Sequence, residues 1–322
     1  MPFAQLVIGP PGSGKSTYCD GMHQFMSAIG RKCSVVNLDP ANDRTSYTPA
    51  LDVRELVTLE EIMAEDTLGP NGGILYALEE VEANFDWLKE GLEGLGGVFL
   101  LVVIHLIDSY NLTLPSMYIS ALLLSLRAML QMDLPHINVL TKIDNLSNYP
   151  PLPFNLDFYT EVQDLSYLMP HLKEESPRLA NSKFDALNQA IVELVQDFGL
   201  VGFETLAVED KKSMMSLLHV IDRAGGYAFG SAEGANDTVW QVAVREGLGT
   251  MDIKDVQERW LDAKDEWDEK ERRGWEEEAK AREEAGKNAP RAGGGDSDVD
   301  MDHMDDFDMS ILPNSGIKVV RK

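Results

Sequence analysis

Cysteine and basic residues are scarce in this chain, and each shortage excludes a class of protein. Of the 322 residues only Cys19 and Cys33 are cysteines, too few for a disulfide framework and without metal-ligand spacing. Lysine and arginine number 28 against 54 acidic residues, a formal net charge of −26. So negative a surface repels phosphate backbones and anionic lipids, and we expect no direct contact with nucleic acid or membrane. Nucleotides remain allowed, because backbone N–H groups and one lysine are enough to hold them.

Long apolar runs are also missing. The longest, Val98 to Ile107, is interrupted by His105 and is too short to cross a bilayer. The N-terminus opens directly into a short apolar run, without a basic region or a cleavage site. We therefore expect an intracellular protein in a reducing compartment. Hydrophobic residues make up 44% of the chain, which supports a packed core.

Apolar runs alternate with segments of helical spacing. The runs that predict strands are Ala4 to Ile8, Cys33 to Leu38, Val98 to Ile107, Ile137 to Leu140 and Phe203 to Val208. Helices are predicted over Lys15 to Ile29, Leu56 to Glu65, Tyr76 to Lys89, Tyr118 to Gln131, Tyr159 to Leu172, Phe184 to Phe198 and Lys211 to Gly225. This alternation is typical of an α/β fold with a doubly wound, mainly parallel sheet.

A phosphate-binding motif follows the first predicted strand. Gly9 to Thr17 reads G-P-P-G-S-G-K-S-T and fits G-x-x-x-x-G-K-[ST] between a strand and a helix. The glycines let successive N–H groups point at a phosphate near the start of the helix. Lys15 is expected to reach the β- and γ-phosphates, and the Ser16 hydroxyl to ligate Mg²⁺. The predicted phosphate-binding residues are Gly12, Ser13, Gly14, Lys15, Ser16 and Thr17. The alternative, a glycine-rich turn that matches by chance, is disfavoured by this context.

A second motif, Thr141-Lys142-Ile143-Asp144, directly follows the strand predicted at Ile137 to Leu140. In GTP-binding proteins an [N/T]-K-x-D element at this place reads guanine. The aspartate accepts hydrogen bonds from N1–H and N2–H₂, and the lysine stem packs over the ring. Adenine lacks this donor pair and would leave Asp144 unpaired, so Thr141, Lys142 and Asp144 are predicted to bind guanine. An ordinary turn at a strand end is the alternative.

Two further polar sites carry weaker signals. Asp39 ends the second predicted strand and could face the γ-phosphate or Mg²⁺, although capping a turn is the commonest role of an aspartate before proline. Gly69-Pro70-Asn71 begins the stretch Gly69 to Gly73, which we expect to be a turn between two helices.

Together these motifs resemble the GPN-loop GTPases. The shared elements are Gly9 to Thr17, Asn37 to Asn42, Gly69-Pro70-Asn71 and Thr141 to Asp144. The runs His105 to Ser109 and Leu134 to His136 are most similar to the second eukaryotic paralogue of this family.

The resemblance implies a P-loop NTPase that hydrolyses GTP with Mg²⁺, with GTP and GDP as its nucleotides. It implies a homodimer, or a heterodimer with a paralogous GPN protein, through Gly69, Pro70 and Asn71. Asp39 and Asn71 are then the candidate catalytic residues, Asn71 approaching the γ-phosphate region of the partner, and Ser16 and Asp39 the metal ligands. It also implies a cytoplasmic protein, with possible shuttling to the nucleus, that assembles and imports RNA polymerase II through its subunits or assembly factors.

One departure from the family is large. Its members carry a strand ending in D-x-P-G-Q, which helps to hold magnesium and the attacking water, before the strand that ends at Asp108. Here Gly91 to Gly97 leads straight into that strand, and D-x-P-G-Q occurs nowhere. By comparison with the family the missing piece is about 35 residues, which would remove a central strand and the switch helix. Asp108 belongs to the neighbouring strand of the pattern, and we do not assign it the missing role.

Three functions follow in order of preference. The first is a GTP-hydrolysing assembly switch, and the second is a nucleotide-binding scaffold that has lost hydrolysis. The third, a P-loop kinase of small molecules, is disfavoured because such kinases usually bind adenine without an element like Thr141 to Asp144. A truncated gene model or a splice form explains the missing piece more simply than an adaptation.

The chain divides into a GTPase domain at 1–249, with a helical insertion at 145–200, a charged helix at 250–290 and a disordered acidic tail at 291–322. Trp260, Trp267 and Trp275 are spaced seven and eight residues apart, so they share one face of the expected charged helix. We expect this stripe to dock on the GTPase domain or on a partner. A solvated helix with incidental aromatic residues is the alternative.

Overall fold

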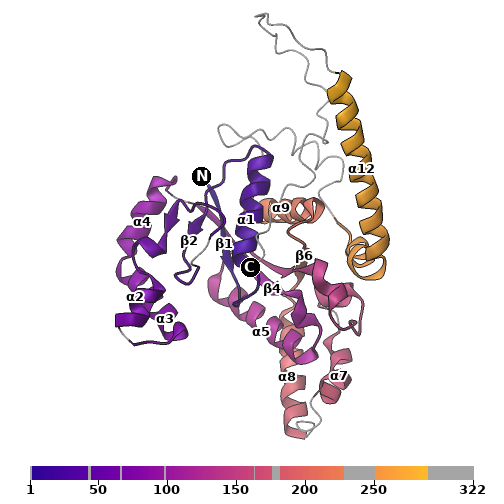
Figure 1. Ribbon diagram of the computed structural model, residues 1–322. Coiled ribbons are helices and arrows are strands. Elements are labelled where there is room, and N and C mark those ends of the chain that lie inside the picture. Colours follow the sequence, from indigo (N-terminus) through magenta and orange to yellow (C-terminus); the bar gives the residue numbers. More distant parts are fainter. Residues whose placement is uncertain are drawn as a thin grey trace, which may run out of the picture.

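The computed structural model describes residues 2–42, 45–65, 67–97, 99–162, 164–175, 182–227 and 251–288. Its centre is a parallel sheet of four strands in the order β1 (Phe3–Ile8), β4 (Leu100–Asp108), β5 (His136–Thr141) and β6 (Phe203–Leu206) (Figure 1). All three pairings are parallel, as the alternation of strands and helices predicts. The architecture is the α/β fold with a parallel central sheet that the sequence predicts.

Helices cover both faces of this sheet. Val102, Ile104 and Leu106 of β4 pack in one cluster with α1 (Lys15–Ala28) and α9 (Lys211–Gly225). Ile107 belongs to a second cluster with α5 (Pro115–Met132) and α8 (Ser182–Phe198). Successive residues of a strand face opposite sides, so a strand covered on both sides reads as one continuous apolar run. None of the helices within the described residues is long and apolar enough to span a bilayer.

The predicted second strand, Cys33 to Leu38, is much shorter than expected. Only β2 (Val36–Asn37) forms, and it pairs with β3 (Leu51–Asp52) in a separate two-stranded sheet. Within the described residues β1 pairs with β4 alone, so the other edge of β1 carries no strand. A strand needs a neighbour to satisfy its backbone groups, and among the described residues no further strand joins β1 to β2, in line with the central strand expected to be missing.

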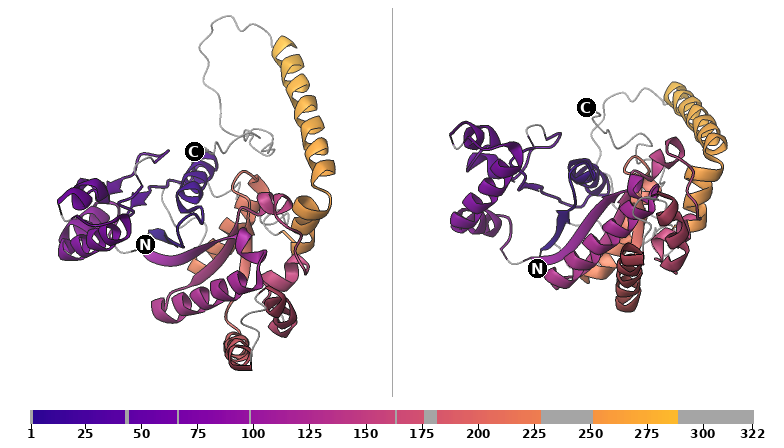
Figure 2. Two further views of the ribbon diagram at one scale, coloured as in Figure 1. Left: turned by 60° about the horizontal axis from the view of Figure 1, so that its bottom comes forward. Right: turned by 90° about the horizontal axis from the view of Figure 1, so that it is seen from below.

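The helices of the N-terminal part gather beside this small sheet. They are η1 (Val53–Glu55), α2 (Leu59–Glu65), α3 (Pro70–Ala83) and α4 (Phe85–Gly94), and they lie to one side of the main sheet (Figures 1 and 2). The turn expected over Gly69 to Gly73 is wrong: Gly69 is the N-cap of α3, and Pro70 occupies its first turn. Proline lacks only an N–H that the first turn of a helix leaves unpaired anyway, so this sequence starts a helix.

The region expected as one helix from Tyr159 to Leu172 is also divided. It consists of α6 (Leu156–Thr160), the 3₁₀ turn η4 (Leu165–Tyr167) and α7 (Leu168–Glu175). Val162 has a φ of 50°, outside the helical region, and so ends the first piece. Before α6, the turn η3 (Ile143–Asn148) follows β5 directly.

The C-terminal charged segment docks at its start. It comprises α11 (Ile253–Gln257), a π-helical turn η5 (Glu258–Asp262) and α12 (Lys264–Asn288). Val256 and Trp260 are buried in the same cluster as α5 and α8, with exposed fractions of 2% and 9%. Trp267 is half-buried, and Lys270 lies over its ring.

The expected docking is therefore confirmed for the first of the three tryptophans. The single stripe is interrupted, because Ala263 leaves the helical conformation between Trp260 and Trp267. The side chain of Trp275 and the acidic tail at 291–322 lie outside the described residues.

Removal of all residues after Gly249 tests the contribution of this docking to stability. We expect the melting temperature to fall by about 5 °C or more, because the sites of Val256 and Trp260 in the core would open to water. Differential scanning calorimetry measures the change, with a chain ending at Asn288 as the control. An unchanged melting temperature in the shorter chain would contradict the assignment of both residues to the core.

Candidate nucleotide-binding site

The phosphate-binding loop connects β1 to α1 at the carboxyl edge of the sheet. A Cβ atom on Gly9 would lie 2.4 Å from the backbone oxygen of Leu106, so the close packing of the loop against β4 requires glycine there. Gly12 and Gly14 have φ angles of 80° and 91°, in the region that favours glycine. Gly14 is the N-cap of α1, so the positive end of the helix dipole faces the loop.

Lys15 occupies the first position of α1. Its Nζ atom donates to the backbone oxygens of Gly9 at 3.1 Å and Pro10 at 3.2 Å. The ammonium group thus lies across the loop, where it can exchange these carbonyl partners for the oxygens of a phosphate. The role predicted for Lys15 at the phosphates stays a prediction.

The end of β5 is tied to the phosphate-binding loop. The buried Thr141 hydroxyl donates to the backbone oxygen of Ser13 at 2.8 Å. Lys142 donates from Nζ to the backbone oxygen of Gly12 at 2.7 Å and pairs with Asp108 at 2.5 Å. Two motifs nearly 130 residues apart therefore form one site. Asp108, which we did not assign to magnesium, is the ion-pair partner of Lys142.

Asp144 lies in η3, the 3₁₀ turn that follows Lys142, and is half-buried. Ile143 and Leu146 of the same turn are buried in the core beneath it. The backbone oxygen of Asp144 accepts a hydrogen bond from Nζ of Lys264, at the start of α12, at 2.6 Å. The sequence analysis missed this contact, because no motif links the two segments.

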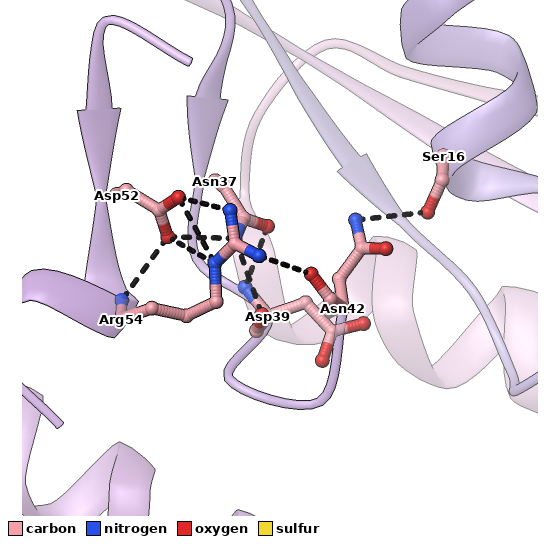
Figure 3. A network of polar contacts seen from close by, with 6 residues as sticks. All are labelled: Ser16, Asn37, Asp39, Asn42, Asp52 and Arg54. Carbon is pink, nitrogen blue, oxygen red and sulfur yellow. Dashed lines mark hydrogen bonds and ion pairs between the residues drawn. The ribbon is translucent and has the colours of Figure 1, made fainter. Parts of the chain in front are cut away.

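A polar network holds the segment after β2 against α1 (Figure 3). Asp52 accepts from the Asn37 side chain and from Nε of Arg54, both at 2.9 Å. The hydrogen bond from Arg54 is the main cause that lowers the pKa of Asp52, so this carboxyl stays ionised and paired. Arg54 also donates to the backbone oxygen of Asn42 at 2.9 Å, and Asn42 donates to Oγ of Ser16 at 3.2 Å.

Asn42 belongs to the run Asn37 to Asn42 that resembles the family, but the resemblance did not predict this network. The signal in the sequence that could have indicated the network is Arg54, which follows Asp52 by two residues at the end of an apolar stretch. Asp39 lies in the same segment, and its Oδ1 accepts from the backbone N–H of Ala41 at 3.0 Å. It therefore caps a turn in the segment that Asn42 joins to Ser16.

The Gly69-Pro70-Asn71 motif lies apart from the phosphate-binding loop. Asn71 is exposed in the first turn of α3. Within the part of the chain that the structure describes, no hydrogen bond joins Asn71 to Gly9–Thr17. The role at the phosphate of a partner subunit, which the family resemblance implies for Asn71, stays a prediction.

The residues around Ser16 suit Mg²⁺. In the described residues no three His, Cys, Asp or Glu side chains form a metal-binding group. Mg²⁺ in nucleotide sites usually takes one or two protein oxygens and completes its shell with phosphate oxygens and water. The hydroxyl of Ser16, exposed at the start of α1, and the carboxylate of Asp39 match that donor set.

The comparisons with known proteins agree with the motifs. A family model described as a conserved hypothetical ATP-binding protein matches residues 7–98 and 92–227. GPN-loop GTPase 2 of Saccharomyces cerevisiae is 48% identical over 305 residues, covering 84% of this chain and 88% of the relative. GPN-loop GTPase 2 of Schizosaccharomyces pombe is 46% identical, covering 87% and 97%. A GTPase from Pyrococcus abyssi, solved in its apo form, shares the fold with a TM-score of 0.55 and 20% identity, covering 70% and 98%.

The same alignments indicate that a segment of the relatives has no counterpart in this chain. The 84% of this chain that aligns with the S. cerevisiae protein is about 270 residues, 35 fewer than the 305 aligned. About 35 positions of the relative thus face no residue here, as expected from the absence of D-x-P-G-Q. The family model matches in two pieces that meet at residues 92–98, where the sequence analysis places the gap.

Fold and site together define a P-loop NTPase. The extent and identity of the matches show that the chain belongs to the GPN-loop GTPase family, and its enzyme class is that of a P-loop GTPase. Both yeast relatives carry the name GPN-loop GTPase 2, which is the paralogue that the resemblance implies.

Lys15→Ala tests the phosphate-binding loop. Nucleotide affinity should fall by about a hundredfold or more, because the lysine provides the charge that the phosphates face. The melting temperature without nucleotide should stay at the parental value, since the hydrogen bonds of Lys15 to described residues go to loop carbonyls and not to the core. Isothermal titration calorimetry with GDP measures the affinity, and the exposed Lys32→Ala is the control. Equal affinity of Lys15→Ala and parent would refute the assignment.

Proposed function

We propose that this protein is a GTP-dependent assembly factor that binds GTP and GDP with Mg²⁺. The observation that carries the proposal is the union of Thr141–Asp144 with the phosphate-binding loop through Thr141 and Lys142. In the proposed complex the phosphates of the nucleotide bind Gly12 to Thr17, and the stem of Lys142 packs against the base.

Guanine is the base that suits this site. In the proposed complex the carboxylate of Asp144 accepts hydrogen bonds from N1–H and N2–H₂ of guanine, whereas adenine offers no such pair of donors. The printed description of the family model mentions ATP, but the names of the relatives and the chemistry of Asp144 favour GTP. A small-molecule kinase, the third candidate, has no such feature in its support.

The phosphate end of the site combines three residues. Lys15 and the N–H groups at the start of α1 neutralise the phosphates, and Ser16 with Asp39 provides oxygens for Mg²⁺. Bound there, the ion would stabilise the charge that develops on the phosphate oxygens. Asn42 holds the Ser16 hydroxyl, so the segment that carries Asp39 can respond to the state of the nucleotide.

We infer that hydrolysis in this chain is slow. The strand that should end in D-x-P-G-Q is absent from the sequence, and in the described part of the chain no strand pairs with the second edge of β1. This second feature favours the alternative of a nucleotide-binding scaffold whose GTP-bound state is long-lived.

Dimerisation is the part of the proposal that completes the site. Asn71 is exposed beside Leu75 and Leu78, whose exposed fractions on α3 are 65% and 49%. Apolar side chains at such exposure suit a subunit interface, with a second copy or a paralogous GPN protein as partner. By family resemblance the clients are subunits or assembly factors of RNA polymerase II. The protein would work in the cytoplasm and accompany its client to the nucleus.

Asp144→Asn tests base recognition. The amide donates a hydrogen bond where the carboxylate accepted one, so preference should move from guanine toward xanthine by about a hundredfold in the affinity ratio. Calorimetric titrations with GDP and XDP give the ratio, and the exposed Asp86→Asn serves as the matched control. If Asp144→Asn keeps the parental preference for GDP, Asp144 does not read the base.

Insertion of the D-x-P-G-Q segment of a relative between Gly94 and Val98 tests the inference on hydrolysis. The kcat for GTP should rise at least about tenfold, because water positioning and contacts to the metal shell supply much of the rate of phosphoryl transfer. Single-turnover assays measure it, with the inserted aspartate changed to alanine as control. A kcat equal to that of the present chain would show that Asp39 or Asp108 supplies the function.

A further inference from the structure

The C-terminal segment contacts the turn that carries Asp144. Nζ of Lys264 donates to the backbone oxygen of Asp144 at 2.6 Å and to Oγ of Ser147 at 2.9 Å. Asp144 lies 120 positions before Lys264 in the sequence, and Ser147 lies 117 positions before it. One ammonium group thus bridges both ends of the η3 turn from the side of the C-terminal extension.

Lys264 is held in place by the docking of the residues before it. Trp260 is buried in the core, and the π-helical turn η5 packs on η3. Gln257 accepts a hydrogen bond from the backbone N–H of Leu156 at 2.9 Å. On the other side, Arg259 pairs with Asp268 at 2.8 Å and fixes the start of α12 relative to η5. The position of Lys264, the first residue of α12, is therefore fixed by contacts of both η5 and α12.

The contact complements the support that η3 receives from below. Ile143 and Leu146 anchor one side of the turn in the core, with exposed fractions of 1% and 2%. Lys264 bonds the opposite, more exposed side, where Asp144 and Ser147 lie. A hydrogen bond between a charged donor and a carbonyl is stronger than a neutral one. Fixing the carbonyl of Asp144 restrains the backbone at its Cα and thereby the direction of the Cα–Cβ bond from which the carboxylate extends.

We propose that Lys264 is a positioning residue for guanine recognition, and that residues 251–264 form part of the nucleotide-binding site. The proposal rests on the proposed role of Asp144 as the residue that reads the base. Lys264 touches no part of the nucleotide in this arrangement; it acts by holding Asp144 where its carboxylate meets both N1–H and N2–H₂.

The arrangement couples the C-terminal extension to nucleotide binding. Guanine nucleotide favours the state in which Asp144 is correctly placed, and docking of 251–264 favours the same state. Each event must then strengthen the other by the same factor, because the coupling free energy is reciprocal. Any interaction that displaces the start of α12 would lower the affinity for guanine nucleotide.

The experiment compares full-length parent and Lys264→Met by calorimetry with GDP and IDP. Inosine has N1–H but lacks the 2-amino group, so a misplaced Asp144 costs guanine more than hypoxanthine. We expect Lys264→Met to weaken GDP binding about tenfold and IDP binding less, so that the GDP/IDP affinity ratio falls. Lys264→Arg, which keeps a charged donor, should restore part of the ratio. The exposed Lys280→Met on α12 should behave as the parent.

Two results would overturn the proposal. One is a parental GDP affinity and a parental GDP/IDP ratio in Lys264→Met. The other is an equal loss for GDP and IDP together with a lower melting temperature, which would indicate a general structural role. Asp144→Asn separates this failure from failure of the proposed function. If Asp144→Asn moves the preference toward xanthine while Lys264→Met changes nothing, only the role of Lys264 is refuted.

Discussion

The hydrogen bond from the buried Thr141 hydroxyl to the backbone of Ser13 joins the two halves of the nucleotide site. It can form because β1, β4 and β5 run parallel, so their carboxyl ends meet at one edge. The glycine at position 9 allows the loop to lie against β4, which brings Ser13 within reach of β5. The approach of the phosphate-binding loop to Thr141–Asp144 thus depends on the register of three strands and on one position without a side chain.

The placement of the helices indicates a larger sheet than the four strands present. Parallel strands are connected by right-handed crossovers. The face on which a connecting helix packs therefore depends on the direction in which the chain moves along the sheet, and two helices on opposite faces mean opposite directions. Helix α1 packs on the face opposite α5. The chain after α1 must therefore move away from β4, and β2 does lie beyond β1 on that side (Figures 1 and 2). The open edge of β1 and the two-piece family match are consistent with a single missing strand between β1 and β2.

Much of this architecture could be predicted from the sequence, because local patterns determine it. The run before Asp108 reads as a doubly covered strand, and the helix expected at Lys211 to Gly225 has those bounds. The start of α3 at Pro70 and the break at Val162 were missed, since glycine and proline suggest turns and a β-branched residue rarely has a positive φ. The contact of Lys264 with Asp144 spans 120 residues and has no periodicity that could announce it.

The open edge of β1 bears on the fate of this chain in a cell. Residues Phe3 to Ile8 are only partly covered, and Leu100 and Leu101 at the start of β4 are 43% and 41% exposed. A strand with unsatisfied backbone groups beside exposed leucines is a template for pairing with other chains, and folded proteins normally protect such edges. Cells recognise such surfaces through chaperones and proteases, which remove partly folded chains. Within the described residues, the edge of β1 is therefore the place where we expect another chain to add a strand.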